Sequence, residues 1–351
     1  FLLSPGLIGR GDYWRSWSFY SFSRDDLESF SNSPWGDWQT HSLTTQEEVE
    51  TQLDLDFDET WSMSLGSSFS TQRFEQSGNF SFRESWEKVS GFGLLRYFSG
   101  SGFELSGGLR VEDYSDFGNP TTWSVFSRQS LSDAGTLFGR YSTSFAPPTA
   151  NDLYYPTSGN LNLQPEEGDS WEVGLALGTN KSTGRTRVTF FNNRIDDLIE
   201  FGFPNVNIGR TKARGIELSL EWDLPGSYRF YGVYAYLDAC NLTSGEDFLD
   251  RRPKHSGSMG LEYFGANTVV GSEMKFRRQM KEKDWHLVSP TYGSWLNADD
   301  FIVVRFYAKH DWNEGLSFFG RVENLLDTEY EEVDGYPALG LGVFGGLRYS
   351  F

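Results

Sequence analysis

The sequence predicts an all-β fold, an antiparallel transmembrane β-barrel with about 16 strands in this chain. Two patterns support this: apolar and polar residues alternate over long segments, and short connections alternate with long ones. In "GFELSGGLRVEDY" (102–114), Leu105 and Leu109 take one set of alternate positions, and Glu104 and Arg110 take the other. Successive side chains of a strand point to opposite faces, so this strand has one apolar face and one charged face.

The same alternation recurs along the whole chain, for example in "VETQLDLDF" (49–57), "SWEVGLALG" (170–178) and "GIELSLEWDL" (215–224). Strands of globular proteins average about 5–6 residues. Crossing a hydrocarbon layer of about 30 Å at a tilt near 45° requires longer strands, as predicted here. The predicted strands are 13–22, 39–57, 60–73, 84–98, 102–114, 120–131, 135–146, 169–178, 184–196, 206–224, 227–238, 253–264, 268–279, 297–312, 315–326 and 340–351.

Connections between these strands alternate in length. Tight turns are predicted at 58–60, 100–102, 132–135, 180–184, 225–226, 265–267 and 313–315. Longer connections are predicted at 23–38, 74–83, 115–119, 147–168, 197–205, 239–252, 280–296 and 327–339. Up-and-down strands of an outer-membrane barrel have short periplasmic turns and longer extracellular loops. A soluble sandwich has Greek-key crossovers and no reason to keep every second connection short.

Aromatic residues make up 17 % of the chain and gather near the predicted strand ends, as at Trp14, Trp61, Tyr97, Trp222 and Trp312. Membrane barrels place aromatic girdles at the level of the lipid headgroups. The final segment, "GVFGGLRYSF" (342–351), is an amphipathic strand that stops on an aromatic residue. Its end resembles the C-terminal signal by which the outer-membrane assembly machinery recognises its substrates.

Composition excludes several classes of protein. The net charge of −19 argues against a nucleic-acid-binding protein, which needs a basic surface. The mean hydropathy is −0.49, and no run approaches the 18 or so apolar residues of a membrane helix. The single cysteine, Cys240, allows no intrachain disulfide and no cysteine-based metal site. We expect no catalytic residue, no cofactor and no resident metal. The pairs Asp25–Asp26, Glu246–Asp247 and Asp299–Asp300 could take Ca²⁺ but are expected to be solvated loop charges.

A specific resemblance begins near residue 141. The segment "YSTSFAPPTANDLYYPTSGNLNLQPEEGDSWEVGL" (141–175) resembles a stretch of TonB-dependent outer-membrane receptors. The matching positions are Ser144, Phe145, Ala146, Pro147, Asp152, Leu153, Tyr154, Gly159, Asn160, Leu163, Pro165, Glu166, Glu172 and Gly174. "FFNNRIDDLIEF" (190–201), "NIGRTKARGIELSLEW" (207–222) and "VENLLDTEYEEVDGY" (322–336) are similar to later segments of the family. The overall order is most similar to the cobalamin-transporter-like branch.

The resemblance implies a barrel of about 22 strands filled by an N-terminal plug. The plug contacts TonB, and the receptor imports a scarce large solute such as a corrinoid, ferric siderophore or glycan across a Gram-negative outer membrane. We find no plug sequence and no TonB box in the chain. We therefore expect residues 1–351 to be one domain, the C-terminal barrel portion of a longer receptor. The alternative is a shortened, plugless barrel that acts as a passive channel.

The resemblance also implies partners and a site. Expected partners are outer-membrane lipid and lipopolysaccharide, the solute, and TonB through a plug outside this chain; the protein is expected to be monomeric and to bind no nucleic acid. Exposed aromatics in the long loops could stack on the solute, pack loop against loop or face lipopolysaccharide. These candidates are Tyr154, Tyr155, Trp285, His286, Tyr292, Trp295, Tyr330 and Tyr336.

The polar faces of the strands are expected to line an aqueous interior. The charged residues of this lining are Glu104, Arg110, Glu112, Glu172, Glu217, Glu221, Glu262, Arg321 and Arg348. An arginine or lysine at Leu105 or Leu218 should then block membrane insertion, whereas the same change at Glu104 or Glu217 should be tolerated.

An outer-membrane hydrolase is the third class considered. "KHSGS" (254–258) places His255 beside Ser256, but neighbouring side chains of a strand point to opposite faces, so they cannot act as base and nucleophile. His286 and Asp284 share a face but lack a nucleophile signature. The sequence therefore favours a transporter over an enzyme.

Overall fold

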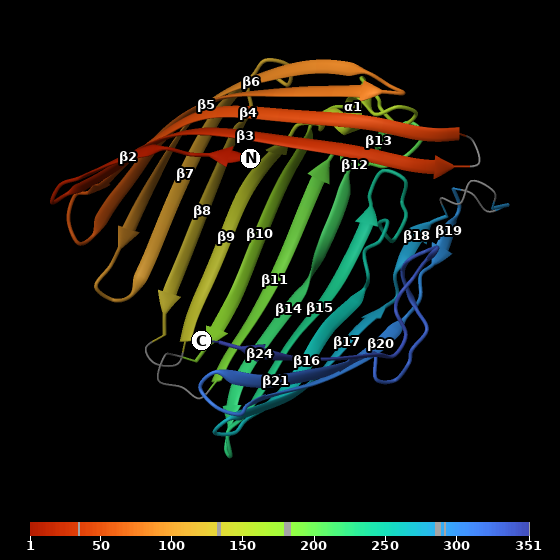
Figure 1. Cartoon of the computed structure of the whole chain (residues 1–351). Helices are drawn as coiled ribbons and strands as arrows, with labels where there is room; N and C mark the ends of the chain where they lie inside the picture. The colour runs from red at the N-terminus through yellow and green to blue at the C-terminus, as the bar shows by residue number, and fades with distance from the viewer. Residues whose placement is uncertain (34–35, 132–134, 179–183, 285–288, 291–292, 351) are drawn as a thin grey trace. The chain divides into compact units, whose positions relative to one another are not determined.

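The computed structural model describes residues 1–350 except 34–35, 132–134, 179–183, 285–288 and 291–292. In these ranges the chain forms 24 strands and one short helix, and 18 of the strands belong to one antiparallel sheet (Figure 1). All of the predicted strands are present in this sheet. The chain divides into two compact units. Unit 1 comprises Phe1–Gln129, Gly139–Trp171 and Arg194–Arg210, and unit 2 comprises Ser130–Phe138, Glu172–Asn193 and Thr211–Phe351.

The elements follow one another as antiparallel hairpins. The first half of the chain contains β1 (Leu2–Leu3), β2 (Gly6–Arg10), β3 (Trp14–Ser33), β4 (Gly36–Asp56), β5 (Trp61–Gly78), β6 (Phe82–Phe98), β7 (Phe103–Tyr114), β8 (Thr121–Ser130), β9 (Gly135–Ala146), α1 (Ala150–Tyr154), β10 (Glu166–Leu177) and β11 (Gly184–Asp196). The second half contains β12 (Ile199–Glu200), β13 (Val206–Asn207), β14 (Thr211–Leu224), β15 (Tyr228–Asn241), β16 (His255–Phe264), β17 (Thr268–Arg278), β18 (Lys281–Lys283), β19 (Trp295–Asn297), β20 (Phe301–Asp311), β21 (Leu316–Glu323), β22 (Glu331–Val333), β23 (Tyr336–Pro337) and β24 (Gly342–Tyr349).

The predicted connection at 23–38 was wrong, because β3 and β4 continue through most of it. Their pairing is unbroken from Trp14 opposite Leu55 to Ser33 opposite Gly36. The segment "RDDLESFSNS" (24–33) carries polar residues on both faces, so apolar alternation does not reveal it. Strands β1 and β2 were also missed. Pro5 separates them because proline lacks an N–H, although its carbonyl still accepts a hydrogen bond from the backbone N–H of Tyr20 at 3.1 Å.

The predicted alternation of connection lengths is found from β6 to the end of the described chain, but not between β3 and β6. Strands β4 and β5, β6 and β7, β14 and β15, β16 and β17, and β20 and β21 are each joined by three or four residues. The predicted long connection at 74–83 was wrong, because β5 and β6 continue through most of it and only residues 79–81 join them. The later connections between hairpins are longer, and four of them contain small elements: α1, β12–β13, β18–β19 and β22–β23. The predicted turns at 132–135 and 180–184 lie almost wholly outside the described residues. Helix α1 begins with a capping box, in which Thr149 and Asp152 satisfy each other's backbone N–H groups.

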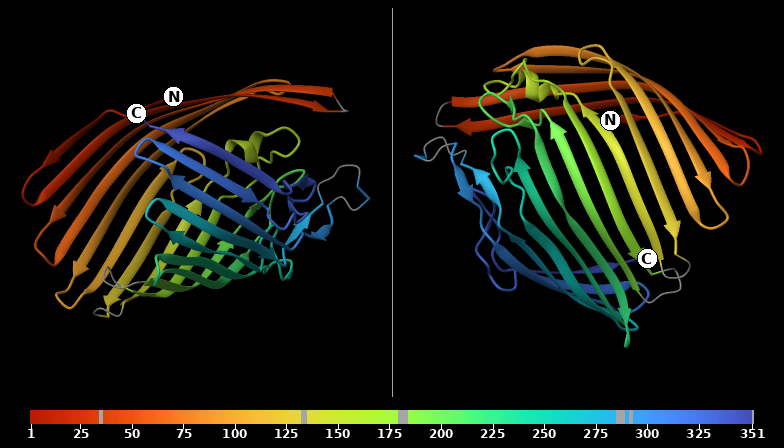
Figure 2. Two further views of the ribbon diagram at one scale, coloured as in Figure 1. Left: turned by 60° about the horizontal axis from the view of Figure 1, so that its bottom comes forward. Right: turned by 180° about the vertical axis from the view of Figure 1, so that it is seen from behind.

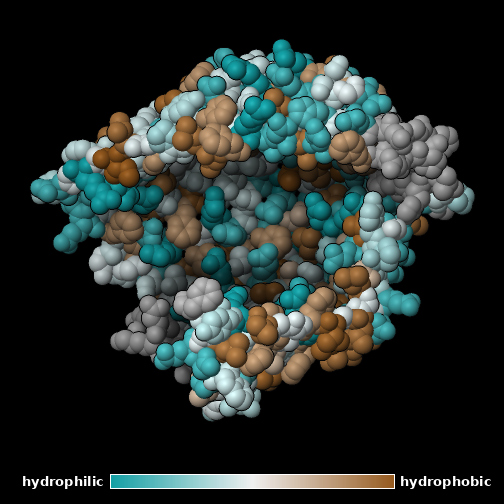
Figure 3. Space-filling view, in the orientation of Figure 1, coloured by the Kyte–Doolittle hydropathy of each residue, from teal (hydrophilic) through white to brown (hydrophobic). Residues whose placement is uncertain are grey.

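In unit 1 the apolar side chains of the sheet are exposed, whereas carboxylates on the polar face are largely buried. On β7, Leu109 is 54 % exposed and Val111 is 51 % exposed, whereas the side chain of Glu112 is 10 % exposed. Polar residues of neighbouring strands satisfy the covered groups: Arg110 Nη2 donates to Ser90 Oγ at 3.0 Å, and Glu104 pairs with Arg128. A soluble protein has the opposite arrangement, with apolar side chains inside. Figure 3 shows hydrophobic and hydrophilic residues interspersed on the face that it draws.

The apolar face is a band of limited height. It includes Met63–Leu65–Phe69 on β5, and register places Leu95–Val89 of β6 and Leu105–Val111 of β7 beside them. Seven strand residues span about 23 Å along the strand, and outer-membrane barrels likewise carry an apolar band of limited height. Toward the long connections the same face becomes polar, at Arg73, Glu87 and Asp113.

Aromatic side chains border this band at the short-turn end, as predicted. In unit 1 the rings of Trp61 and Tyr97 lie 4.9 Å apart, and in unit 2 those of Tyr228 and Tyr263 lie 5.1 Å apart. The strands that carry each pair lie side by side in both views of Figure 2. Trp17 lies on the polar face of the sheet, where it is paired with Gln52. Trp14, paired with Leu55, lies on the apolar face.

Glycines on the polar face make room for aromatic rings of the adjacent strand. A Cβ on Gly271 of β17 would lie 2.3 Å from the ring of Tyr307, which is directly opposite on β20. The Tyr307 hydroxyl donates to Glu262 Oε1 at 2.6 Å, which fixes the ring over the glycine. A ring over a glycine pins the register of a sheet.

We expect Gly271→Ala to lower stability by about 1–3 kcal/mol, because the ring must move away from the added methyl group. Thermal unfolding of the full-length protein in detergent measures the effect. Gly107→Ala on β7 is the control, since its Cβ would meet no atom within 4 Å. Equal destabilisation by the two substitutions would contradict the packing account.

Candidate ligand-binding site

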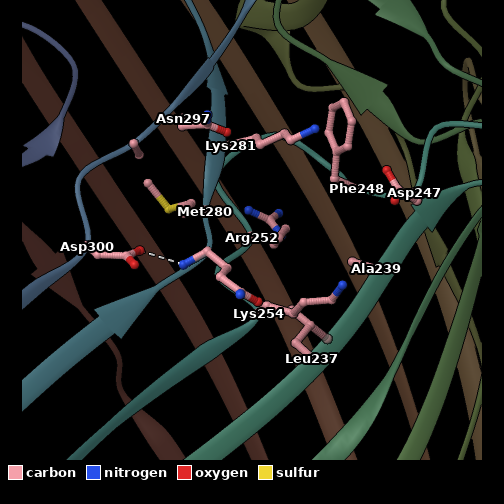
Figure 4. Close-up of a pocket in the computed structure, with 12 residues that line it drawn as sticks. Leu237, Ala239, Asp247, Phe248, Arg252, Lys254, Met280, Lys281, Asn297 and Asp300 are labelled. Carbon is pink, nitrogen blue, oxygen red and sulfur yellow. Dashed lines mark hydrogen bonds between the residues drawn. The ribbon is translucent and has the colours of Figure 1, made fainter.

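A cavity of about 480 Å³ lies at the long-connection end of unit 2 (Figure 4). It is bordered by β15, by the 242–254 connection and by the segment that follows β17. Its lining residues are Leu237, Ala239, Asp247, Phe248, Arg252, Lys254, Gln279, Met280, Lys281, Asn297, Ala298 and Asp300. The floor is apolar, since Ala239 and Met280 are both buried.

The polar part of the lining consists of cations and two carboxylates. Arg252 and Lys254 come from "RRPK" (251–254), and Lys281 comes from β18. Asp300 accepts a hydrogen bond from the backbone N–H of Gln279 at 2.6 Å (dashed in Figure 4) and one from Arg278. The cavity therefore combines an apolar floor with positively charged walls, an arrangement that suits an anionic ligand with some apolar surface.

Aromatic packing holds the two connections around the cavity. Trp295 of β19 donates from its ring nitrogen to Glu246 Oε1 at 3.0 Å, and its ring packs edge-on against Phe248 with centroids 4.7 Å apart. The Lys281 ammonium lies 3.9 Å from the centre of the Phe248 ring. Such cation–π contacts stabilise a lysine without neutralising it.

Beside the cavity, Glu282 connects three segments of the loop region. Its carboxylate is 3 % exposed and accepts from Arg251 Nε at 3.3 Å and from the backbone N–H of Asp334 at 3.2 Å. Arg251 belongs to the 242–254 connection, and Asp334 lies between β22 and β23. The Glu282 carboxylate therefore joins β18 to the 242–254 connection and to the segment between β22 and β23.

The structure distributes the predicted ligand residues over several places. In unit 2, Trp295 packs beside the cavity through Phe248. Tyr330 borders a separate cavity of about 410 Å³ that also holds Glu273 and Arg305; burial, followed by the charge of Glu332, raises the pKa of its phenol. Tyr336 is 74 % exposed on β23. A role for these residues in binding stays a prediction.

In unit 1, Tyr154 of α1 stacks on Phe82 with ring centroids 5.3 Å apart, and burial raises the pKa of its hydroxyl. Its neighbour Tyr155 is exposed. Trp285, His286 and Tyr292 lie outside the described residues. The Tyr154 ring therefore packs α1 against β6, and a role for Tyr154 or Tyr155 in ligand binding stays a prediction.

Sequence reasoning missed Arg252, Lys254 and Lys281. The signal available was two basic runs, "RRPK" and "KEK" (281–283), in a strongly acidic chain. Each run lies in a long connection, and only the fold brings them to one cavity. Aromatic content drew attention to the loops but not to these cations.

At least one member of each acidic pair accepts from a protein donor. Asp26 pairs with Arg24, and Asp299 Oδ2 accepts from the backbone N–H of Glu331 at 3.2 Å. The described part of the chain contains no group of three or more His, Cys, Asp or Glu side chains placed to hold a metal ion.

The positions of His255 and Ser256 are as predicted. His255 Nδ1 lies 2.8 Å from the Tyr234 hydroxyl on the apolar face of unit 2, whereas Ser256 borders cavities on the polar face. A base and a nucleophile on opposite faces cannot exchange a proton directly.

Long antiparallel strands that expose apolar side chains on one face and pair charged side chains on the other define the class of membrane β-barrel chains. A family model described as "TonB dependent receptor-like, beta-barrel" matches residues 10–325. The chain belongs to this family, which confirms the resemblance. None of the helices in the described ranges has the length and apolar character of a membrane-crossing helix.

Relatives and solved structures agree with this assignment. The vitamin B12 transporters BtuB of Photobacterium profundum and Vibrio cholerae are 25 % and 26 % identical over 264 and 261 residues. These matches cover 72 % and 70 % of this chain, which spans about two fifths of each relative (41 % and 40 %). The ferripyoverdine receptor of Pseudomonas aeruginosa superposes with a TM-score of 0.84 at 14 % identity, covering 100 % of this chain and 56 % of that receptor. The ferric enterobactin receptor of the same organism superposes with a TM-score of 0.80 at 16 % identity, covering 100 % of this chain and 61 % of that receptor.

Proposed function

We propose that this chain is the barrel portion of an outer-membrane receptor for TonB-dependent uptake of a scarce large solute. The observation that carries the proposal is the exposed apolar face opposite a face of paired charges, as on β7, where Leu109 is exposed and Glu112 is largely buried. Lipid is the medium in which an open apolar band of this height is stable.

The relatives support the uptake of a solute of the size of a corrinoid or a ferric siderophore. The curated relatives are named as vitamin B12 transporters, and two structural neighbours as receptors for ferripyoverdine and ferric enterobactin. On this proposal residues 1–351 form one barrel domain, the polar strand faces line its interior, lipopolysaccharide surrounds it, and TonB acts through a plug outside this chain. The long connections would then face the outside of a Gram-negative cell.

Sidedness tests the proposal directly. The full-length protein is expressed in a Gram-negative host with Cys240→Ser, and a single cysteine is introduced at Tyr336 on β23 or at Glu314 in the β20–β21 turn. We expect a membrane-impermeant maleimide to label Tyr336→Cys on intact cells and Glu314→Cys only after the envelope is disrupted. Both positions are exposed, so access to the side of the membrane decides the result.

Uptake of cyanocobalamin and of ferric siderophores by the same cells, with and without TonB, tests transport. TonB-dependent accumulation of one of them is the expected outcome. Labelling of both cysteines on intact cells, or recovery of the protein in the soluble fraction, would overturn the membrane assignment. Solute flux that does not need TonB would favour the passive channel.

A further inference from the structure

The cavity of unit 2 is positively charged in an acidic chain. The whole sequence has 49 acidic and 30 basic residues. The cavity lining instead has three cations, Arg252, Lys254 and Lys281, and two carboxylates. Because Asp300 already accepts hydrogen bonds from Gln279 and Arg278, Asp247 is the carboxylate left to balance three positive charges.

The three cations keep donors available for a ligand. Arg252 Nη1 donates to the carbonyl of Asp250 at 3.4 Å, a long hydrogen bond, and Lys281 rests on the face of Phe248. Throughout the described ranges, neither these two side chains nor Lys254 forms an ion pair with a carboxylate. Arg214 and Arg278, by contrast, pair with Asp238 and Asp300.

The cavity opens on the polar face of the sheet. Leu237 and Ala239 share a face of β15 with Val233, which borders the cavity that holds Glu273 and Arg305. Lipid phosphate would approach from the opposite face, where Tyr234 meets His255. A solute in the interior is therefore the ligand that reaches these cations.

We propose that Arg252, Lys254 and Lys281 bind a compact polyanionic group of the imported solute, such as two or three carboxylates, with Phe248 and Met280 contacting its apolar part. The inference rests on the proposed function and narrows it, since it predicts an anionic rather than a neutral solute. A cavity of 480 Å³ admits a group of this size. Guanidinium and ammonium groups form strong charge-assisted hydrogen bonds to carboxylates.

Calorimetric titration of the purified full-length protein in detergent tests the proposal with citrate as the probe. Triethyl citrate, which has the same skeleton without the charges, is the neutral comparator. We expect citrate to bind and triethyl citrate to show no heat of binding. Citrate binding should weaken as the ionic strength rises from about 0.05 M to about 0.5 M, since screening weakens charge contacts.

Two double substitutions, each removing two positive charges, provide a test and its control. Lys254→Gln/Lys281→Gln should weaken citrate binding by about tenfold or more. Lys309→Gln/Lys275→Gln removes the same charge outside the cavity and should change it by less than about twofold. No citrate binding by the unmodified protein, equal binding of the two probes, or equal loss in both variants would overturn the proposal. These binding measurements do not depend on membrane insertion or transport. If citrate did not bind but cells took up a neutral solute with TonB, this inference would fail and the proposed function would stand.

Discussion

Leu109→Arg is expected to block insertion of the protein into the outer membrane. Leu109 lies in the middle of β7, is 54 % exposed and stands opposite Trp123 on the apolar face. An arginine facing lipid near the midplane costs about 2–4 kcal/mol. The next residue, Arg110, shows that an arginine at the same height is accepted on the polar face, where Ser90 and Glu112 receive its hydrogen bonds.

Two controls separate lipid contact from packing. Ser124→Arg on β8 places the same side chain on the polar face, directly across from Gly108. Leu109→Ala removes most of the side chain without adding charge. We expect both variants to reach the outer membrane in normal amount, measured by fractionation and immunoblotting, and Leu109→Arg to be largely absent from it.

The three variants together decide the orientation of the faces. Equal loss of Leu109→Arg and Ser124→Arg from the membrane would mean that both faces are packed against protein. Loss of Leu109→Ala as well would identify Leu109 as a core residue rather than a lipid-facing one. Either result would contradict the assignment of Leu109 to the lipid-facing side of the sheet. The same assignment of Leu105 and Leu218 would then fail as well.

The barrel strands could be predicted because a lipid-facing strand must alternate apolar and polar residues along its whole crossing. Leu105, Leu109 and Val111 show this rule, and every strand that obeys it was found. The rule ends where the strand leaves the apolar band. For that reason the outer parts of β3 and β4, with residues such as Asp25 and Glu28, were predicted as a connection.

The candidate site could be predicted only in part, because it is built from connections far apart in the sequence. Arg252 and Lys281 belong to different loops, and no local pattern states that they border one cavity. Trp295 was singled out as an exposed aromatic, yet the structure places its ring against Phe248, where it supports the cavity wall. Residue type indicated the region, and the packing of the loops determined the roles.

Glu282 of β18 connects the 242–254 connection with the segment between β22 and β23. We expect Arg251→Ala to make local opening of these segments easier. Among the described residues, the substitution would leave a carboxylate that is 3 % exposed with a single donor, the backbone N–H of Asp334. Removing one partner of a buried ion pair costs about 3–5 kcal/mol, and the lower end applies here because Arg251 is 41 % exposed. Hydrogen exchange of the amides in β18 and in 331–337 should then accelerate about a hundredfold, as local opening becomes easier.

The charge of Glu282, rather than the size of Arg251, causes this expected loss, and a double substitution separates the two. Glu282→Gln removes the buried charge, so Arg251→Ala in that background should accelerate exchange by less than about tenfold. The adjacent residue, Arg252, contacts no carboxylate of the described chain. Arg252→Ala should therefore leave the hydrogen exchange of β18 unchanged. If Arg251→Ala were equally harmful with glutamine at 282, packing of the arginine stem would hold the loops, and Glu282 would not be their electrostatic anchor.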